Sequence, residues 1–167
     1  ELFGRNVDKE AVVVDTRFNG GGWLHDDLLV LLSGERYFDL RPRGRVVRGE
    51  PVERWTKPSA VLMNEGNYSD AYMFPFAYDK FDVGPTVGMP VPGTGTAVWW
   101  ETLHTGDIVF GIPQLPALDD GEPVENRQLE PDVKVNNPPE AAAAGQDEPL
   151  EAAVQTLLDL VDNNRDE

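Results

Sequence analysis

The sequence predicts an α/β domain built on a parallel sheet, and three observations lead to this fold class. Short apolar, β-branched runs at residues 11–15 and 60–63 suit strands that are buried on both faces. Each run is followed by a turn rich in Gly or Asn, and then by apolar residues at helical spacing. Two strand–turn–helix units in succession are typical of a parallel sheet, because its strands are joined by crossover helices. We therefore expect both turns to meet at the carboxyl edge of one sheet.

The first unit begins with the strand at 11–15 and is broken by Gly20-Gly21-Gly22. Apolar residues then recur at helical spacing until Gly34 offers a C-terminal cap; they are Trp23, Leu24, Leu28, Leu31 and Leu32. Residues 35–57 are basic and rich in Gly and Pro, with a short β-like piece at Arg45-Val46-Val47. This composition predicts an exposed connecting loop.

The second unit places Ser69 at the start of a helix that runs to about Phe81, and Pro75 is expected to kink this helix or delay its start. Residues 86–135 are predicted to be rich in strands, and Asp119-Asp120-Gly121 indicates a hairpin. Residues 141–144 are expected to belong to a polar linker. A closing amphipathic helix follows, marked by Leu150, Val154, Leu157, Leu158 and Val161.

The charge of the chain argues against two classes of partner. The formal net charge is −16, and residues 119–167 hold 14 acids against 3 bases, a net −11 that leaves −5 for the first 118 residues. Such a field repels phosphate backbones and anionic lipid headgroups, so neither nucleic acid nor a membrane surface is expected as a partner. Cysteine is absent, which excludes disulfides, thiolate nucleophiles and Cys-based zinc sites. No apolar run approaches the roughly 18 residues that a membrane-spanning helix needs.

Ser69 and the triple glycine each allow two interpretations. Ser69 is either a helix N-cap or an exposed nucleophile whose following N–H groups point at a developing oxyanion. The glycines form either a plain tight turn or a bare backbone that a substrate approaches closely. Glu125 lies in the acidic carboxy-terminal part of the sequence, and its position alone predicts a solvated carboxylate.

The two histidines matter because a serine nucleophile usually needs a base. His25 stands beside Asp26 and Asp27, which suggests a polar helix face. His104 precedes Gly106 in a predicted turn and is expected to be exposed. Neither histidine has a neighbouring pattern that marks a general base.

Three blocks of sequence, taken together, resemble a known family. They are Asp15-Thr16-Arg17-Phe18-Asn19-Gly20-Gly21-Gly22, then Asn64-Glu65 leading into Ser69-Asp70, and then Val124-Glu125-Asn126 leading into Glu130-Pro131-Asp132-Val133. In this order they resemble the catalytic core of the tricorn-type members of the carboxy-terminal processing, or tail-specific, serine peptidases. The resemblance covers nearly the whole chain, from about Glu10 to the last helix.

The resemblance implies a fold like that of the Clp protease and crotonase group, in which ββα units form a spiral around the active site. It implies Ser69 as the nucleophile and the N–H groups of Gly22 and Asp70 as the oxyanion hole. It also implies that Glu125 supports the residue pair that orients the catalytic histidine. No metal or organic cofactor is implied.

The family histidine, preceded by a serine, lies upstream of the triple-glycine strand. We therefore expect residues 1–167 to be the carboxy-terminal catalytic portion of the peptidase. The histidine-bearing segment and the PDZ module would then lie upstream, so the isolated chain is expected to be inactive. The block Gly66-Asn67-Tyr68 departs from the small residues often found before the nucleophile, which suggests a narrower pocket.

The resulting hypothesis is a serine endopeptidase that acts on peptides or unfolded polypeptides and self-associates, in the cytoplasm or the periplasm. A non-catalytic peptide-binding or assembly module of the same fold is the first alternative. A crotonase-like acyl-CoA enzyme is the second, and the charge of −16 argues against it because CoA is itself a polyanion.

Overall fold

The computed structural model describes residues 5–44 and 48–166, and its centre is a four-stranded sheet. The strand order is β1-β4-β5-β10, and all three pairings are parallel. The strands are β1 Val12–Asp15, β4 Ser59–Met63, β5 Thr86–Gly88 and β10 Val133–Lys134. The predicted parallel sheet and the two predicted strands are therefore confirmed.

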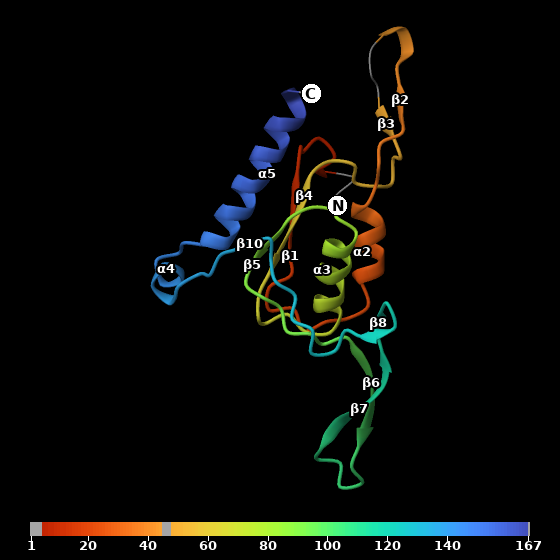
Figure 1. The fold of residues 1–167 in the computed structure, drawn as a ribbon, viewed down its shortest axis with the longest axis vertical. Helices are drawn as coiled ribbons and strands as arrows, with labels where there is room; N and C mark the ends of the chain where they lie inside the picture. The colour runs from red at the N-terminus through yellow and green to blue at the C-terminus, as the bar shows by residue number, and fades with distance from the viewer. Residues whose placement is uncertain (1–4, 45–47, 167) are drawn as a thin grey trace.

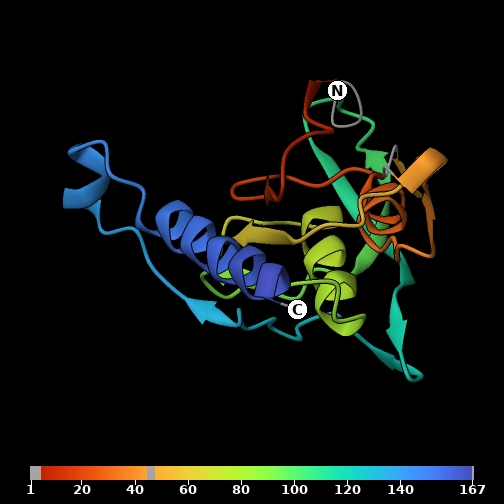
Figure 2. The ribbon, with the colours of Figure 1, turned by 90° about the horizontal axis from the view of Figure 1, so that it is seen from above.

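Helices cover both faces of this sheet (Figures 1 and 2). Helices α2 (His25–Leu32) and α3 (Asp70–Lys80) lie on one face, and α5 (Glu148–Asp166) lies on the other. The side chains of β4 alternate accordingly: Val61 packs with residues of α2 and α3, and Leu62 packs with Ala153 of α5. Every residue of β4 is buried, which explains its continuous apolar run.

Two details of the first unit differ from the sequence prediction. β1 is an edge strand whose valines are only half-buried, because no strand pairs with its outer side within the described residues. Trp23 and Leu24 are exposed and precede α2 instead of belonging to its buried face. The helical spacing therefore identified the helix correctly but placed its start too early.

Pro75 lies inside α3, and the helix continues through it to Lys80. Proline has no N–H, so it leaves the carbonyl of Ala71, four residues earlier, without its usual helical partner. The side-chain amide of Asn67 donates to this carbonyl at 2.9 Å and to Thr16 Oγ1 at 2.8 Å. Asn67 is buried, and through these two bonds it compensates the helix and ties α3 to the end of β1.

Two hairpins extend from the body of the molecule (Figure 1). The first pairs β2 (Phe38–Leu40) with β3 (Arg48–Glu50), where the sequence predicted only a connecting loop; the β-like piece at 45–47 lies outside the described residues. A 3-10 turn, η1 (Pro42–Gly44), lies between them. The second hairpin pairs β6 (Thr96–Thr102) with β7 (Val109–Pro116).

A small hairpin confirms the turn predicted at residues 119–121. It joins β8 (Leu118–Asp119) to β9 (Glu122–Pro123). Asp120 and Gly121 both have positive φ, 51° and 87°, as a type I′ turn requires.

The carboxy-terminal segment contains a helix that the sequence did not predict. Residues expected to be a polar linker form α4 (Pro139–Ala143), with Ala141 buried. The closing helix α5 is confirmed; Pro149, Ala153 and Leu157 are buried, while Leu150, Val154 and Leu158 are exposed. The small alanine allows α5 to pack closely on the sheet.

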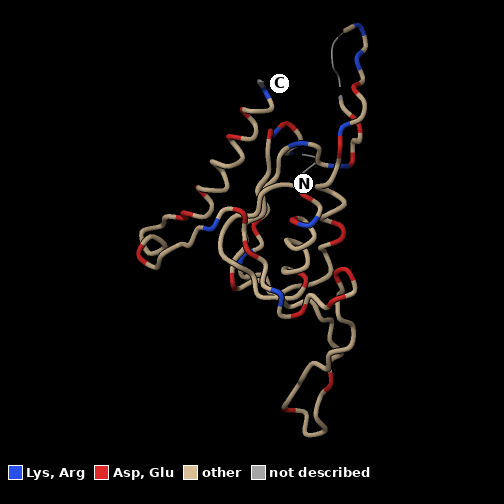
Figure 3. Tube along the Cα trace, viewed as in Figure 1, with Lys and Arg blue, Asp and Glu red and all other residues tan. Residues whose placement is uncertain are grey.

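The charges are unevenly distributed along the chain (Figure 3). Lys and Arg are frequent in the segment around the β2–β3 hairpin, while acidic residues are spread along α5. Among the described residues, no helix is long and apolar enough to cross a membrane.

Arg17 holds α5 against the end of β1. Its guanidinium donates to both Asp15, at 2.7 Å, and Asp147, at 2.8 Å, and Asp147 Oδ1 also accepts the N–H of Leu150 in the first turn of α5. The hydrogen bonds from Arg17 are the main reason that the pKa of each carboxyl lies below its ordinary value of 3.8. Charge-assisted hydrogen bonds of this kind favour the ionised carboxylate.

We expect Arg17→Met to weaken the acid dependence of folding stability. A lowered carboxyl pKa contributes stability above about pH 4, and this contribution is lost as the pH falls through the folded-state value. Wild-type unfolding free energy should therefore decline more steeply below pH 4 than that of Arg17→Met, in urea titrations. At neutral pH the variant should lose only about 1 kcal/mol or less, because solvent partly screens the pair. Arg54→Met, at an exposed arginine without an ion pair in the described chain, is the control, and equal slopes would contradict the prediction.

Candidate active site

The two predicted turns meet at the carboxyl edge of the sheet. The N–H of Tyr68 donates to the carbonyl of Asn19 at 2.9 Å. A Cβ on Gly21 would lie 2.8 Å from Ser69 Cβ and 2.9 Å from the Tyr68 carbonyl oxygen. Only glycine permits this approach, and Gly21 also has a φ of 100°. The triple glycine therefore lies directly against the turn that carries Ser69.

Ser69 occupies the N-cap position of α3 in a strained conformation. Its backbone has φ 56° and ψ −118°, which is rare for a residue with a side chain. Its side chain makes no capping hydrogen bond, and no hydrogen bond of its hydroxyl is found within the described residues. Thus Ser69 holds the cap position without capping the helix. Strain of this kind is concentrated at functional sites.

Some backbone N–H groups near Ser69 donate no hydrogen bond within the described residues. Gly21 donates its N–H to Asn19 Oδ1 at 2.8 Å. The N–H groups of Gly22 and Asp70 have no hydrogen-bond acceptor among residues 5–44 and 48–166. These two donors are the ones that the resemblance implies for the oxyanion hole, and both remain open to a ligand.

The carboxylate of Asp70 points away from helix α3 toward α2. Oδ2 accepts the N–H of Leu24 at 2.9 Å, and Oδ1 lies 3.4 Å from the N–H nitrogen of His25. Oδ1 also pairs with His25 Nδ1 in a short contact. The interpretation of His25 as part of a polar helix face is therefore wrong, because its ring is half-buried against a carboxylate that the sequence places 45 residues away.

A threonine that the sequence prediction did not include also contacts the Ser69 turn. The N–H of Ser69 donates to Thr94 Oγ1 at 2.8 Å. Thr94 belongs to the loop that precedes β6. No local pattern distinguished Thr94, because its contact depends on a residue 25 positions earlier in the chain.

Glu125 stands next to a residue that is hydrogen-bonded to the loop containing Thr94. Its neighbour Asn126 donates to the carbonyl of Gly93 at 3.0 Å. The Glu125 side chain is half-buried and makes no hydrogen bond or ion pair within the described residues. Burial raises the pKa of Tyr72, and the Glu125 carboxylate adds to this effect. The structure therefore does not join Glu125 directly to Ser69, Asp70 or His25.

His104 is exposed in the turn between β6 and β7, as expected. Its position on the β6–β7 hairpin gives it no hydrogen bond to Ser69 or Asp70. Among the described residues, no group of three or more His, Asp or Glu side chains is arranged to hold a metal ion.

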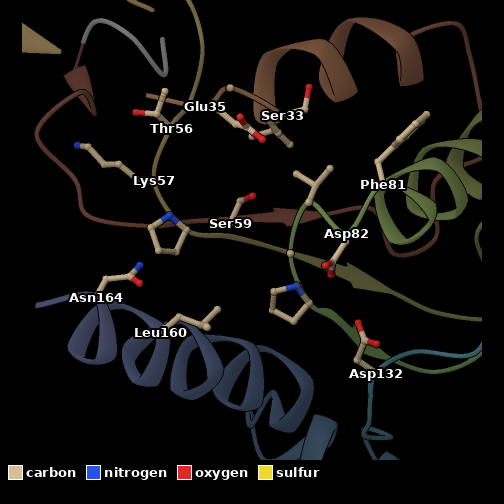
Figure 4. Close-up of a pocket in the computed structure, with 16 residues that line it drawn as sticks. Ser33, Glu35, Thr56, Lys57, Ser59, Phe81, Asp82, Asp132, Leu160 and Asn164 are labelled. Atoms are coloured by element: carbon tan, nitrogen blue, oxygen red, sulfur yellow. The ribbon is translucent and has the colours of Figure 1, made fainter. Parts of the chain in front are cut away.

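One pocket of the described chain lies away from this site (Figure 4). It measures about 630 Å³ and opens at the amino ends of the strands, where Ser59 begins β4 and Pro85 precedes β5. A second pocket of about 230 Å³ lies at the carboxyl ends, lined in part by Phe18, Asn64 and Glu65. This second pocket shares the edge of the sheet that carries Ser69.

Comparison with known proteins identifies the family of this chain. The sequence profile of Peptidase family S41 matches residues 3–135, more than half of the chain. The chain belongs to peptidase family S41. The predicted resemblance is thereby confirmed, and the motifs quoted above from residue 15 to residue 133 lie inside the matched region.

Curated relatives resemble the chain over most of its length. The tricorn protease of Thermoplasma acidophilum is 25% identical over 168 residues, which cover 99% of this chain and 16% of the relative. Tricorn protease homolog 1 of Streptomyces coelicolor is 30% identical over 157 residues, covering 91% of this chain and 14% of the relative. The chain thus spans about one sixth of the length of these S41 relatives.

Solved structures support the fold of this S41 chain. The crystal structure of the tricorn protease aligns with a TM-score of 0.80 at 24% identity, covering 91% of this chain and 15% of that one. Mature CPAF aligns with a TM-score of 0.58 at 24% identity, covering 71% and 23%. The predicted α/β fold is confirmed by these similarities.

Proposed function

We propose that this S41 chain carries the nucleophile and oxyanion hole of a serine endopeptidase, with Ser69 forming an acyl-enzyme. The observation that carries the proposal is the strained backbone of Ser69, whose hydroxyl lacks a hydrogen bond in the described chain. Beside it lie the unengaged N–H groups of Gly22 and Asp70. A capping serine would bond to its own helix, whereas a nucleophile needs a free hydroxyl next to donors for the oxyanion.

The proposed reaction follows acyl transfer. The Ser69 oxygen attacks the scissile carbonyl carbon and loses its proton to a base, and the N–H groups of Gly22 and Asp70 stabilise the resulting oxyanion. The base then returns the proton to the leaving amine, and the peptide bond breaks. Water attacks the ester in the second half of the reaction and regenerates the Ser69 hydroxyl.

The base is proposed to be a histidine outside these 167 residues. His25, which pairs with Asp70 through Nδ1, makes no hydrogen bond to Ser69 within the described residues. The relatives are several times longer than this chain, which supports a larger peptidase. We propose that residues 1–167 form its carboxy-terminal catalytic portion. We extend the proposal to its substrates, which would be peptides or unfolded polypeptides, the class that a peptidase family acts on.

Glu125 is proposed to support the groups that orient this histidine. We expect Glu125→Gln in the full-length protein to lower kcat/KM by about 10–100-fold, less than the loss in Ser69→Ala, because it takes no part in bond making. Steady-state hydrolysis of a fluorogenic peptide measures the difference. Glu122→Gln, at an exposed glutamate on β9, is the matched control. A loss in Glu125→Gln as large as that in Ser69→Ala would place Glu125 among the reacting groups.

The decisive experiment is labelling with a fluorophosphonate, which reacts with activated serine hydroxyls. The full-length protein is expected to be labelled at Ser69, with the adduct located by peptide mass spectrometry. Residues 1–167 alone should be labelled far more slowly, since an unactivated serine is a poor nucleophile. No labelling of the full-length protein would favour the non-catalytic alternative, and rapid labelling of residues 1–167 would refute the external base.

Self-association is also part of the proposal. The β6–β7 hairpin exposes large apolar side chains, among them Trp99, Trp100 and Leu115. Two-stranded hairpins with such exposure are rarely stable without a covering surface. A monomeric full-length protein in sedimentation equilibrium would refute a homo-oligomer.

A further inference from the structure

The side chain of Asp70 links the two halves of the candidate active site. Helix α2 begins at His25, and its N-cap residue, Leu24, provides no side-chain acceptor. The first N–H groups of a helix need acceptors, and the carboxylate of Asp70 supplies them from another helix. The side chain is buried, with 8% of the residue exposed, so these bonds are protected from water.

The position of this link in the sequence matters for the oxyanion hole. Leu24 lies two residues after Gly22, and Asp70 directly follows Ser69. The carboxylate of one proposed oxyanion donor, Asp70, therefore holds the segment that carries the other, Gly22. Gly22 itself is exposed, and a Cβ there would contact only Asp70 Oδ2, at 4.0 Å.

A carboxylate so close to an oxyanion hole would oppose the negative charge of the oxyanion unless its own charge were directed elsewhere. Both oxygens of Asp70 face donors: the positive end of the α2 helix dipole and the ring of His25. The hydrogen bonds that the Asp70 carboxylate accepts therefore lie on the α2 side. The Asp70 N–H remains free on the Ser69 side.

We propose that Asp70 and His25 act as positioning residues: the Asp70 carboxylate, held in orientation by the His25 ring, fixes the Gly22 N–H at its distance from the Asp70 N–H. This inference rests on the proposed peptidase function for its kinetic consequence. Its structural consequence, a restrained Gly22–His25 backbone, does not depend on catalysis. Preorganised donors stabilise the transition state and contribute little to binding of the ground state.

The kinetic test compares variants of the full-length protein on a fluorogenic peptide. Asp70→Ala should lower kcat by about 10²-fold with KM within about twofold, because only the oxyanion loses stabilisation. Asp70→Asn keeps one side-chain oxygen for the Leu24 N–H and should recover to within about tenfold of wild type. His25→Ala leaves both backbone bonds to Asp70 in place, so its loss should be smaller than that of Asp70→Ala. Asp26→Ala, at an exposed acid of the same helical turn, should have unchanged kinetics.

The structural test is amide hydrogen exchange in the same full-length variants. In Asp70→Ala the amides of Leu24 and His25, which donate to the Asp70 carboxylate, should exchange at least about tenfold faster than in wild type, while those of buried β4 stay unchanged. If Asp70→Ala does not fold, the exchange rates of Asp70→Asn provide the test, and an intermediate acceleration is expected. Unchanged exchange at Leu24 and His25, or an effect on KM alone, would overturn the proposal.

The two proposals fail in different ways. If the wild-type protein neither hydrolyses peptides nor reacts with a fluorophosphonate, the proposed function is refuted. The amide hydrogen exchange measurement still tests the structural role of Asp70. If wild type is active and Asp70→Ala keeps full kcat, the positioning role fails and the peptidase function stands. A loss in His25→Ala as complete as that in Ser69→Ala would make His25 the base and overturn its assignment as a positioning residue.

Discussion

Replacing Ser69 with alanine is expected to abolish peptide hydrolysis by the full-length protein, with a loss of about 10⁴–10⁶-fold in kcat. The substitution removes the hydroxyl proposed to form the acyl-enzyme, and the other two serines of the sequence, Ser33 and Ser59, lie at the pocket on the opposite edge of the sheet (Figure 4). Hydrolysis of a fluorogenic peptide and fluorophosphonate labelling measure the loss. Ser33→Ala, at an exposed serine of that pocket, should retain full activity and labelling.

The same substitution should leave folding nearly unchanged. Ser69 makes no capping hydrogen bond, so the usual cost of about 1 kcal/mol for removing an N-cap does not apply. Ser69→Gly should even raise the unfolding temperature, because glycine relieves the positive φ. A clear drop in the melting temperature of Ser69→Ala would indicate that the serine is structural. Retained peptide hydrolysis by Ser69→Ala would refute the assignment of Ser69 as the nucleophile.

Gly21→Ala is expected to have the second largest effect. The new methyl group would lie 2.8 Å from Ser69 Cβ and 2.9 Å from the Tyr68 carbonyl oxygen, so the two turns must separate. The positive φ of 100° adds about 1–3 kcal/mol of strain. A displacement of about 1 Å between nucleophile and oxyanion donors costs about 10² in rate. We therefore expect kcat to fall by at least about 10²-fold, together with a lower melting temperature.

Gly20→Ala is the matched control, because a Cβ there meets no atom within 4 Å. It changes the same glycine block by the same methyl group and should retain activity within about threefold, as surface substitutions usually do. Equal losses in the two variants would mean that the block acts through its flexibility and not through the close approach of Gly21. An active Gly21→Ala would show that the two turns need not touch during catalysis.

Local patterns in the sequence were enough to predict the central fold. The runs around Val13 and Val61 have the continuous β-branched character of parallel strands, and the triple glycine breaks the chain between the first strand and its helix. Solvent exposure was harder to predict, because the sequence does not state where a strand lies in its sheet. β1 proved to be an edge strand, and α5 buries Ala153 and Leu157 while Leu150, Val154 and Leu158 of its predicted apolar stripe stay exposed.

The sequence by itself determined the fold class, the family and the identity of the residues proposed for the site, since each depends on residue type and order. Only the tertiary structure decided how those residues meet. The pairing of His25 with Asp70 and the bond from the Ser69 N–H to Thr94 join positions 45 and 25 residues apart. Such contacts depend on how crossover helices and loops return to one edge of the sheet, and neighbouring residues in the sequence carry no record of that path.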